Sequence, residues 1–391
     1  MSAEARTRPA SHRFLWLFAL AWAGGAVAYV PFLTILLPLR VVAATGERSV
    51  LVLGLITFFG AVAASVGNIA FGWLSDRGGT RRPWIAAGLA LSCAILVAIP
   101  LAQGAWQILA AVVCWQLALN MMLGPLSAWA ADRVPREMTG YLGGLMALSP
   151  AMGALAGVIV TVPGLAGPDA RLGLVALMVA ACVLPALLLI RSPPSAAAPQ
   201  TDSPRPPRRF ALTMWAARLL VQIAEAALFA YLLLYFRSLD PGMDESRMAR
   251  LFGAVLVAAV PVAILMGRWA DRSTRPARPL AICALLSALG LIALALASDV
   301  AQATAAYVCF GLATTVFLSL HGGQTLRVLP SPSHRGRDLG LFNLTNTIPS
   351  LIMPWLTIAI VPRNGFAALF AVLALLALAS AALLFTLKRL D

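Results

Sequence analysis

The chain has 391 residues and a formal net charge of +14, with 61% hydrophobic and 11% charged residues and a mean hydropathy of +0.87. Soluble domains carry about 25% charged and about 45–50% apolar residues. The composition therefore excludes a water-soluble globular core, a disordered chain and a collagen-like chain. It predicts a protein that resides in the lipid bilayer.

Twelve apolar runs follow one another along the chain, and each is about long enough to cross the hydrocarbon core as a helix. They lie near residues 14–38, 50–74, 84–102, 105–131, 141–163, 172–190, 211–236, 251–267, 278–297, 301–324, 339–361 and 365–387. The first run is too long for the apolar core of a cleavable signal peptide. We therefore expect a multi-pass helical membrane protein.

Most of the lysine and arginine residues fall in loops on one side of the predicted membrane, the side of the basic N-terminus. An excess of arginine in short loops orients a membrane protein with that side in the cytoplasm. We therefore predict a bacterial-type inner (plasma) membrane protein with both termini cytoplasmic. The positive charge is attributed to this orientation and not to nucleic-acid binding.

All five cysteines fall inside apolar runs, where they are expected to be small buried hydrophobic side chains. They are Cys93, Cys114, Cys182, Cys283 and Cys309. Their spacing matches no metal-ligand pattern, so no metal site and no cofactor are predicted. The sequence also shows no phosphate-binding loop and no catalytic triad, and an enzyme is not expected.

A segment rich in proline, serine and alanine, RSPPSAAAPQTDSPRPPRR, divides the twelve runs into six and six. Its composition is typical of a flexible linker. We therefore predict a cytoplasmic tail at 1–13, a six-helix bundle at 14–190, a cytoplasmic linker at 191–210, a second six-helix bundle at 211–387 and a cytoplasmic tail at 388–391.

The two halves share two short motifs. Residues 72–77 (GWLSDR) correspond to residues 267–272 (GRWADR), with aspartates 195 positions apart, and residues 135–140 correspond to 332–336, with glycines 196 positions apart. Two echoes at nearly one offset indicate an internal repeat. The expected fold is an all-α membrane protein with twelve transmembrane helices in two pseudo-symmetric six-helix bundles.

Residues 72–82 (GWLSDRGGTRR) resemble the signature loop of the major facilitator superfamily: glycine, three residues, Asp-Arg, then glycine and two arginines. The resemblance implies a secondary transporter that works by alternating access of its two bundles. In such a loop the aspartate can cap a helix or pair with arginines. The expected gating residues are Gly72, Asp76, Arg77, Arg81, Arg82, Gly267, Asp271, Arg272 and Asp338.

Two finer resemblances suggest different substrates. Residues 335–349 (RGRDLGLFNLTNTIP) are similar to the eleventh-span entry of sucrose-type and glycoside–pentoside–hexuronide symporters, which implies a sugar or glycoside. This chain lacks the acidic residues that such symporters generally carry in the first, second or fourth span. Residues 149–154 (SPAMGA) are similar to the Gly-Pro-x-x-Gly-Gly element of proton-coupled antiporters that export drugs and metabolites. A simple Pro/Gly kink explains the same residues.

Glu225 is the acidic residue placed deepest in an apolar run, and Arg218 and Gln222 lie on the same helix. Offsets of four and three residues put the three side chains on one helix face over about 10 Å. Ionisable residues in spans usually face the protein interior or a water-filled cavity. Glu225 is therefore the candidate proton site, with Arg218 as the second proton-coupling residue, and Arg218 is also a candidate ligand for an anionic or hydroxyl-rich solute. A fixed structural network is the alternative.

The superfamily resemblance implies that the first, fourth, seventh and tenth spans line a central cavity. Polar residues of these spans, together with two asparagines of the eleventh run, are the candidates for substrate binding. They are Trp22, Tyr29, Gln116, Asn120, Arg218, Gln222, Thr314, Ser319, Asn343 and Asn346, with Tyr307 and His321 as further candidates. Interface anchoring of Trp and Tyr, backbone bonding of Ser and Thr and interhelical bonding of the asparagines are the structural alternatives.

The sequence thus predicts a monomeric secondary transporter that moves a small organic solute across the bilayer, with protons as the coupling ion. A sugar or glycoside is the first expectation for the substrate. The alternatives are a proton-coupled antiporter that exports amphipathic metabolites or drugs, and a receptor or scaffold that transports nothing.

Overall fold

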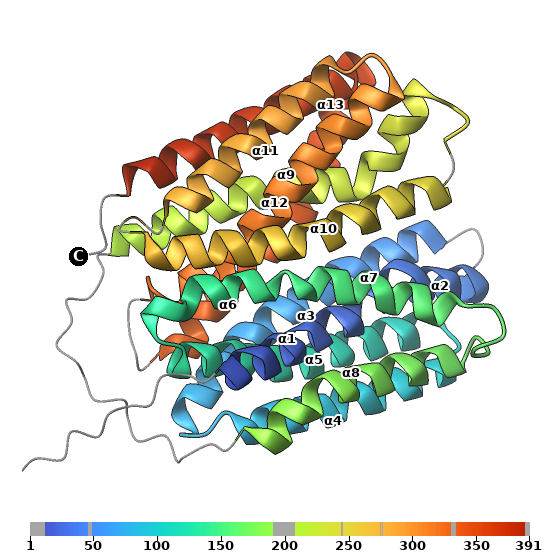
Figure 1. The fold of residues 1–391 in the computed structure, drawn as a ribbon. Helices are drawn as coiled ribbons and strands as arrows, with labels where there is room; N and C mark the ends of the chain where they lie inside the picture. Colours follow the sequence, from blue (N-terminus) through green and yellow to red (C-terminus); the bar gives the residue numbers. More distant parts are fainter. Residues whose placement is uncertain are drawn as a thin grey trace, which may run out of the picture.

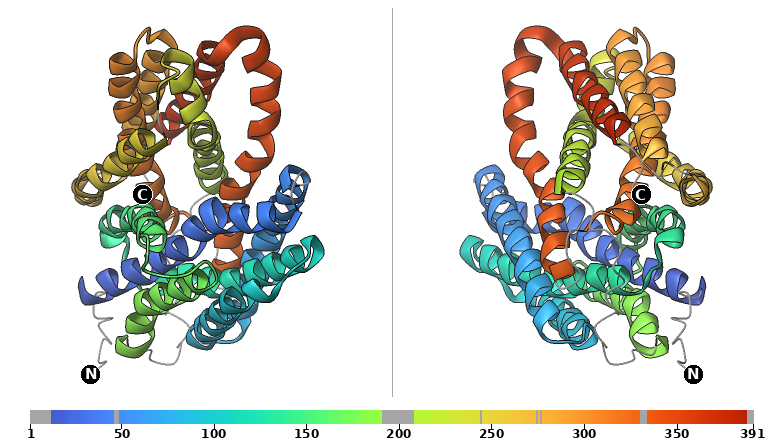
Figure 2. Two further views of the ribbon diagram at one scale, coloured as in Figure 1. Left: turned by 90° about the vertical axis from the view of Figure 1, so that its right-hand side faces the viewer. Right: turned by 90° about the vertical axis from the view of Figure 1, so that its left-hand side faces the viewer.

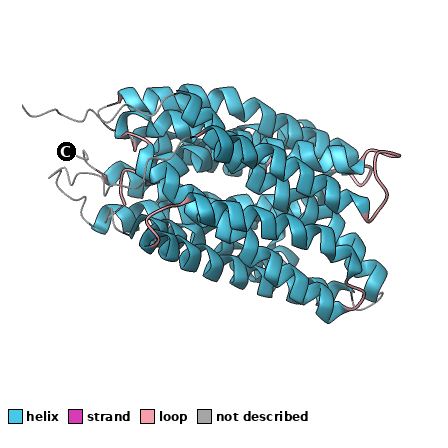
Figure 3. Cartoon of the chain, turned by 90° about the horizontal axis from the view of Figure 1, so that it is seen from below, coloured by secondary structure: helices cyan, strands magenta, loops and turns pink. Residues whose placement is uncertain are grey.

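The computed structural model describes residues 12–45, 49–190, 208–243, 245–273, 275, 277–329 and 334–387. Within these residues the chain is almost entirely helical and contains no strand, and the helices run side by side (Figure 3). The predicted all-α membrane fold is confirmed. Residues 1–11, 191–207 and 388–391, where most of both tails and of the linker were expected, lie outside the described residues.

The first half of the chain forms the lower group of helices in Figure 1. It consists of α1 (His12–Pro31), the π-helical turn η1 (Phe32–Leu36), α2 (Leu37–Thr45), α3 (Ser49–Arg77), α4 (Arg82–Ala98), η3 (Ile99–Leu101), α5 (Ala105–Arg133), η4 (Arg136–Met138), α6 (Thr139–Met146), α7 (Leu148–Thr161) and α8 (Ala170–Leu189). The first pass extends to Thr45, beyond the predicted end near residue 38, because helix continues through the π-turn after Pro31.

The second half forms the upper group, with one exception in its last helix. It consists of α9 (Arg208–Leu239), α10 (Glu245–Arg272), α11 (Arg278–Leu296), α12 (Val300–Thr325) and α13 (Arg335–Thr386). The exception is the first part of α13, which reaches down beside α3 and α5 of the first half (Figure 1 and Figure 2). The helix α13 contains the last two predicted runs. They are separated at Gly365, whose φ of 74° and ψ of 177° suit glycine and almost no other residue. The chain turns back there (Figure 2).

Eleven segments of the described chain are long and apolar enough to cross a membrane, the last of them Ala359–Thr386. The predicted run near 339–361 is the first arm of α13 and completes the twelve. Large apolar side chains such as Leu177, Leu188, Val257 and Leu265 are exposed, which suits a surface solvated by lipid.

Each half has its own hydrophobic core. Trp115, Phe18 and Phe32 are fully buried in the cluster of the first half. Phe236 and Phe317 belong to the two clusters of the second half. The clusters also cross between the groups: Ala147 of the first half belongs to the cluster of Phe317, and Ile264 and Leu326 of the second half pack against the first cluster. The closest backbone approaches between the groups are made at glycines.

Candidate functional site

The polar face of α9 is present as predicted. Gln222 Nε2 donates to Glu225 Oε2 at 2.8 Å, and Arg218, Gln222 and Glu225 are all partly exposed. Arg218, at one end of this face, donates to Asn346 on the first arm of α13, and the neighbouring Thr347 Oγ1 lies 2.9 Å from Ser65 Oγ of α3 in the other half. The Arg218 end of the face therefore lies near a contact between the two halves.

Arg218 contacts neutral acceptors. One terminal nitrogen, Nη1, donates to the carbonyl oxygen of Leu318 at 3.1 Å and lies 3.4 Å from His321 Nδ1. The other, Nη2, donates to Asn346 Oδ1 at 3.1 Å. Among the described residues Arg218 forms no ion pair with Glu225 or with any other acid.

His321 is fully buried on α12, and its neighbours determine its protonation state. Its Nε2 lies 2.8 Å from the carbonyl oxygen of Met214, which can only accept. Its Nδ1 lies 3.4 Å from Arg218 Nη1, which can only donate, and 3.1 Å from the hydroxyl of Thr325, which can donate or accept. The imidazole is therefore neutral, with the proton on Nε2. Of the further candidates, His321 is the one that the structure joins directly to Arg218.

The two asparagines of α13 complete this cluster. Asn346 Nδ2 donates to Asn343 Oδ1 at 2.7 Å, and Asn346 remains exposed. The indole of Trp215 on α9 donates to the carbonyl oxygen of Leu341 at 3.0 Å, which holds α9 against this arm of α13. Arg218, His321, Asn343 and Asn346 thus form one cluster from three helices, which we call the Arg218 cluster.

The polar pair of the fourth span serves helix packing. Asn120 Nδ2 donates to the carbonyl oxygen of Gln116 at 2.9 Å, and Asn120 Oδ1 accepts from Asn68 Nδ2 at 3.0 Å. Both asparagines are buried. Asn68 of α3 was not predicted, because a single polar residue in an apolar run gives no sign of its partner on another helix.

The remaining predicted contacts are scattered. Thr314 Oγ1 lies 2.9 Å from Ser287 Oγ at the buried interface of α12 and α11, and Ser319 donates to the carbonyl oxygen of Thr315 in its own helix. Trp22 stacks on Phe18, with the ring centres 6.2 Å apart. These three residues are not brought into the Arg218 cluster.

The Pro150 segment forms a kink. The fifth pass is interrupted at Ala147, whose N–H donates to the carbonyl oxygen of Gly144, since Pro150 has no N–H to bond to residue 146. A Cβ on Gly153 would lie 2.8 Å from Val30 Cγ2, so this glycine lets α7 pack closely on α1.

The two halves are closed against each other where α3 and α10 finish and α13 and α6 begin, which we call the arginine-rich end. Asp76, near the end of α3, accepts from the backbone N–H of Gly336 at 2.9 Å and of Arg337 at 3.1 Å. Arg81 Nη2 lies 2.7 Å from Asp76 Oδ1. An aspartate of one half therefore caps the first turn of α13 in the other half.

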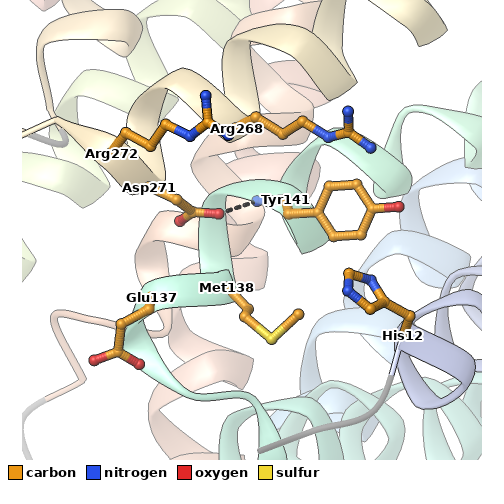
Figure 4. Close-up of a pocket in the computed structure, with 7 residues that line it drawn as sticks. All are labelled: His12, Glu137, Met138, Tyr141, Arg268, Asp271 and Arg272. Atoms are coloured by element: carbon orange, nitrogen blue, oxygen red, sulfur yellow. Dashed lines mark hydrogen bonds between the residues drawn. The ribbon is translucent and has the colours of Figure 1, made fainter.

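Asp271 repeats this arrangement in the opposite direction. It accepts from the N–H groups of Gly140 and Tyr141, both at 2.7 Å, and pairs with Arg327 at 2.7 Å. Asp271 points at the backbone of Tyr141 beside a pocket of about 340 Å³ (Figure 4). The lining residues are His12, Glu137, Met138, Tyr141, Arg268, Asp271 and Arg272.

Glycines bring the backbones together at both caps. A Cβ on Gly72 would lie 2.4 Å from the carbonyl oxygen of Gly336, and one on Gly267 would lie 2.2 Å from that of Gly140. Arg272 lines the pocket shared by both halves, and three other predicted gating residues bind within their own half. Arg77 lies 3.7 Å from the ring centre of Trp73, Arg82 donates to the carbonyl oxygen of Leu187, and the buried Asp338 pairs with Arg337.

Comparisons with known proteins agree with this architecture. A family model described as Major Facilitator Superfamily matches residues 214–391. The structure of the human organic anion transporter MFSD10 (TETRAN) is similar, with a TM-score of 0.73, 16% sequence identity, and coverage of 95% of this chain and 98% of that chain. The chain has the major facilitator fold.

Two further structures share this fold. A bacterial homologue of the iron transporter ferroportin, in an outward-facing state, matches with a TM-score of 0.70 and 16% identity over 95% of this chain and 98% of that chain. The proton:xylose symporter XylE, bound to 6-bromo-6-deoxy-D-glucose, matches with a TM-score of 0.73 and 12% identity over 96% of each chain. No curated protein matches the chain in sequence. The findings support the major facilitator superfamily, without favouring its sugar symporter subgroup.

Proposed function

We propose that this protein is a proton-coupled secondary transporter that moves a small organic solute across the inner membrane by alternating access. The observation that carries the proposal is the polar face of Arg218, Gln222 and Glu225, which is partly exposed and whose Arg218 end bonds to the arm of α13 that contacts the other half. A receptor or scaffold would not need ionisable groups at this place, because charges in a span are costly.

The crosswise caps support alternating access. Asp76 and Asp271 each hold the backbone of the other half, so the arginine-rich end opens when these two sets of hydrogen bonds separate. Each aspartate keeps an arginine of its own half, and its charge therefore stays partnered during the separation. Rocking of the halves then exposes the Arg218 cluster to either side in turn.

Glu225 is the proposed proton site. It accepts one hydrogen bond from Gln222 and has no cation in direct contact among the described residues, so protonation breaks no ion pair. Arg218 lies seven residues earlier on the same helix face, about 10 Å away along the axis. A carboxylate in this setting can gain and lose a proton as the halves rearrange.

The substrate class follows from the site and not from the fold, since the three similar structures are those of an organic anion transporter, an iron transporter homologue and a sugar symporter. The resemblance at residues 335–349 favours a sugar or glycoside, and the amides of Gln222, Asn343 and Asn346 suit hydroxyl groups. Export of amphipathic metabolites is the alternative, suggested by the kink at Pro150.

The test begins with thermal unfolding of the purified protein against sugars, glycosides, organic anions and lipophilic cations, because a solute that binds the folded state raises its stability. Uptake of the stabilising solute is then measured in proteoliposomes. Glu225→Gln should abolish accumulation driven by a pH gradient and leave solute exchange intact. Asp169→Asn removes a carboxylate whose side chain is 78% exposed and serves as the control. Normal accumulation in Glu225→Gln would disprove the assignment.

A further inference from the structure

The charges of Arg218 and its surroundings indicate which class of small organic solute the site binds. We infer that the solute is an organic anion whose carboxylate binds Arg218, and that it moves together with one proton so that the cycle carries no net charge. This inference rests on the proposed transport function and names the substrate of the same site.

Among the described residues, no anion contacts the Arg218 cation. Its guanidinium is always protonated, and its three protein partners are a carbonyl oxygen, an amide oxygen and an imidazole nitrogen. His321 cannot become a counterion, and its bond to the carbonyl of Met214 keeps Nδ1 as the acceptor. Holding an unpaired charge inside a span is costly, and an anionic solute removes that cost.

The donors that Arg218 leaves unused fit a carboxylate. Contacts to Leu318 and His321 occupy Nη1, and the contact to Asn346 occupies one hydrogen of Nη2. The Nε–H and the second Nη2–H have no acceptor among the described residues. A carboxylate accepts two N–H bonds from one guanidinium, and the exposed amide of Asn346 lies beside it.

The charges of Arg218 and Glu225 also link binding of the anion to binding of the proton. With Glu225 ionised, the charges of Arg218 and Glu225 cancel, and a bound anion would leave the site with one negative charge. With Glu225 protonated, the anion cancels Arg218. The groups that contact the pair are Gln222, the neutral His321, the carbonyl of Leu318 and the amide of Asn346. Proton and anion therefore favour each other's binding, and the coupling is reciprocal.

The binding test uses matched pairs of solutes that differ in charge: glucuronate and glucose, lactate and propane-1,2-diol, benzoate and benzyl alcohol. Thermal unfolding of the full-length protein is recorded with each, at acidic and at neutral pH. We expect a carboxylate to stabilise the protein, more strongly at acidic pH, while its neutral partner does not. If no carboxylate stabilises the protein, or if a neutral partner does so equally, the anion assignment is wrong.

Variants at the Arg218 cluster locate the binding. Arg218→Gln should weaken carboxylate binding by about 30-fold or more, and Arg218→Lys should retain part of it. Asn346→Asp places a carboxylate 3.1 Å from Arg218. It should unfold no earlier than the native protein and yet lose carboxylate binding, because it supplies the anion itself. Gln103→Glu adds the same charge at an exposed loop position and should bind normally. Normal binding by Asn346→Asp would overturn the inference.

Transport measurements test the anion inference and the proposed proton coupling separately. Uptake of the stabilising carboxylate in proteoliposomes should respond to a pH gradient and not to a membrane potential set with potassium and valinomycin. Proton-driven accumulation of a neutral sugar would overturn the anion inference and leave the proposed function standing. Binding of a carboxylate with no response of its uptake to the pH gradient would refute the proposed proton coupling and leave the anion site in place.

Discussion

At the arginine-rich end the two halves contact each other at two places, the caps made by Asp76 and Asp271, which we call the first and the second crossing. The two crossings share their hydrogen-bond geometry but differ in the charged residues around them. Asp76 caps α13, and Asp271 caps α6, each with two backbone N–H groups of the other half. Residues 195 positions apart occupy equivalent places in the two halves, yet Asp132 of the first half corresponds to Arg327 of the second. The capping geometry is therefore repeated, whereas the source of the partner cation is not.

This difference determines how each crossing is held. In the first, Arg81 bridges Asp76 and Asp132, and Asp132 in turn pairs with Arg335 of the other half at 3.2 Å. In the second, Arg327 pairs with Asp271 and donates to Thr139 Oγ1 of the other half. Among the described residues, the first crossing thus carries an ion pair between the halves, whereas the second carries a hydrogen bond to a hydroxyl and places the Arg268 guanidinium 5.3 Å from the centre of the Tyr141 ring.

The largest expected effect comes from the glycines that both crossings share. Gly72→Ala and Gly267→Ala each place a Cβ within 2.4 Å of backbone of the other half, and because overpacking costs about 1–3 kcal/mol the halves must separate locally. Amide hydrogens at residues 336–337 in the first variant and 140–141 in the second should exchange about tenfold faster or more. Hydrogen exchange with mass spectrometry measures this.

Gly253→Ala on α10 is the matched control, since a Cβ there meets nothing within 4 Å, and it should leave exchange at both crossings unchanged. If only one of the two substitutions, Gly72→Ala or Gly267→Ala, accelerates hydrogen exchange at its crossing, the two crossings do not respond alike, and our view that they share one geometry is wrong.

An intermediate effect is expected from the partner cations. Arg81→Gln leaves Asp76, whose side chain is 3% exposed, without its arginine, and Arg327→Gln does the same to Asp271, which is 11% exposed. Because the more buried carboxylate loses more when its partner is removed, Arg81→Gln should lower the thermal unfolding midpoint further. We expect each to destabilise the protein by about 1–3 kcal/mol. A larger loss in Arg327→Gln would contradict this order.

The sequence predicted these motifs better than their partners. The repeated Gly-x-x-x-Asp-Arg pattern identified Asp76 and Asp271 as capping or ion-pairing residues, because the motif is local. It could not show that each aspartate caps a helix of the opposite half, since an internal repeat reports similarity and not contact. Likewise, helix periodicity placed Arg218, Gln222 and Glu225 on one face. The bond from Arg218 to Asn346, 128 positions away, depends on how α9 packs against α13.

Sequence periodicity also could not identify the neighbours of the polar residues Thr314 and Asn120 on other helices. Thr314 was selected because the tenth span faces the centre in the superfamily, but a helix has several faces, and Thr314 lies on the one that meets Ser287 of α11. Asn120 was paired with Gln116 by spacing alone, and its bond to Asn68 needed the position of α3. Periodicity thus assigns residues to a face, and only packing assigns that face to a neighbour.

The smallest effect is expected when the Asp132–Arg335 ion pair, which distinguishes the first crossing from the second, is removed. Asp132→Asn removes the ionic link to Arg335, whose side chain is 23% exposed against 29% for Asp132, and exposed ion pairs contribute about 0–1 kcal/mol. Exchange at residues 336–337 should therefore rise by no more than a few-fold, while exchange at residues 140–141 stays unchanged. High salt should produce the same pattern in the native protein, because it screens exposed charges, and should add nothing in Asp132→Asn. Equal salt sensitivity at the two crossings would show that the ionic link does not distinguish them.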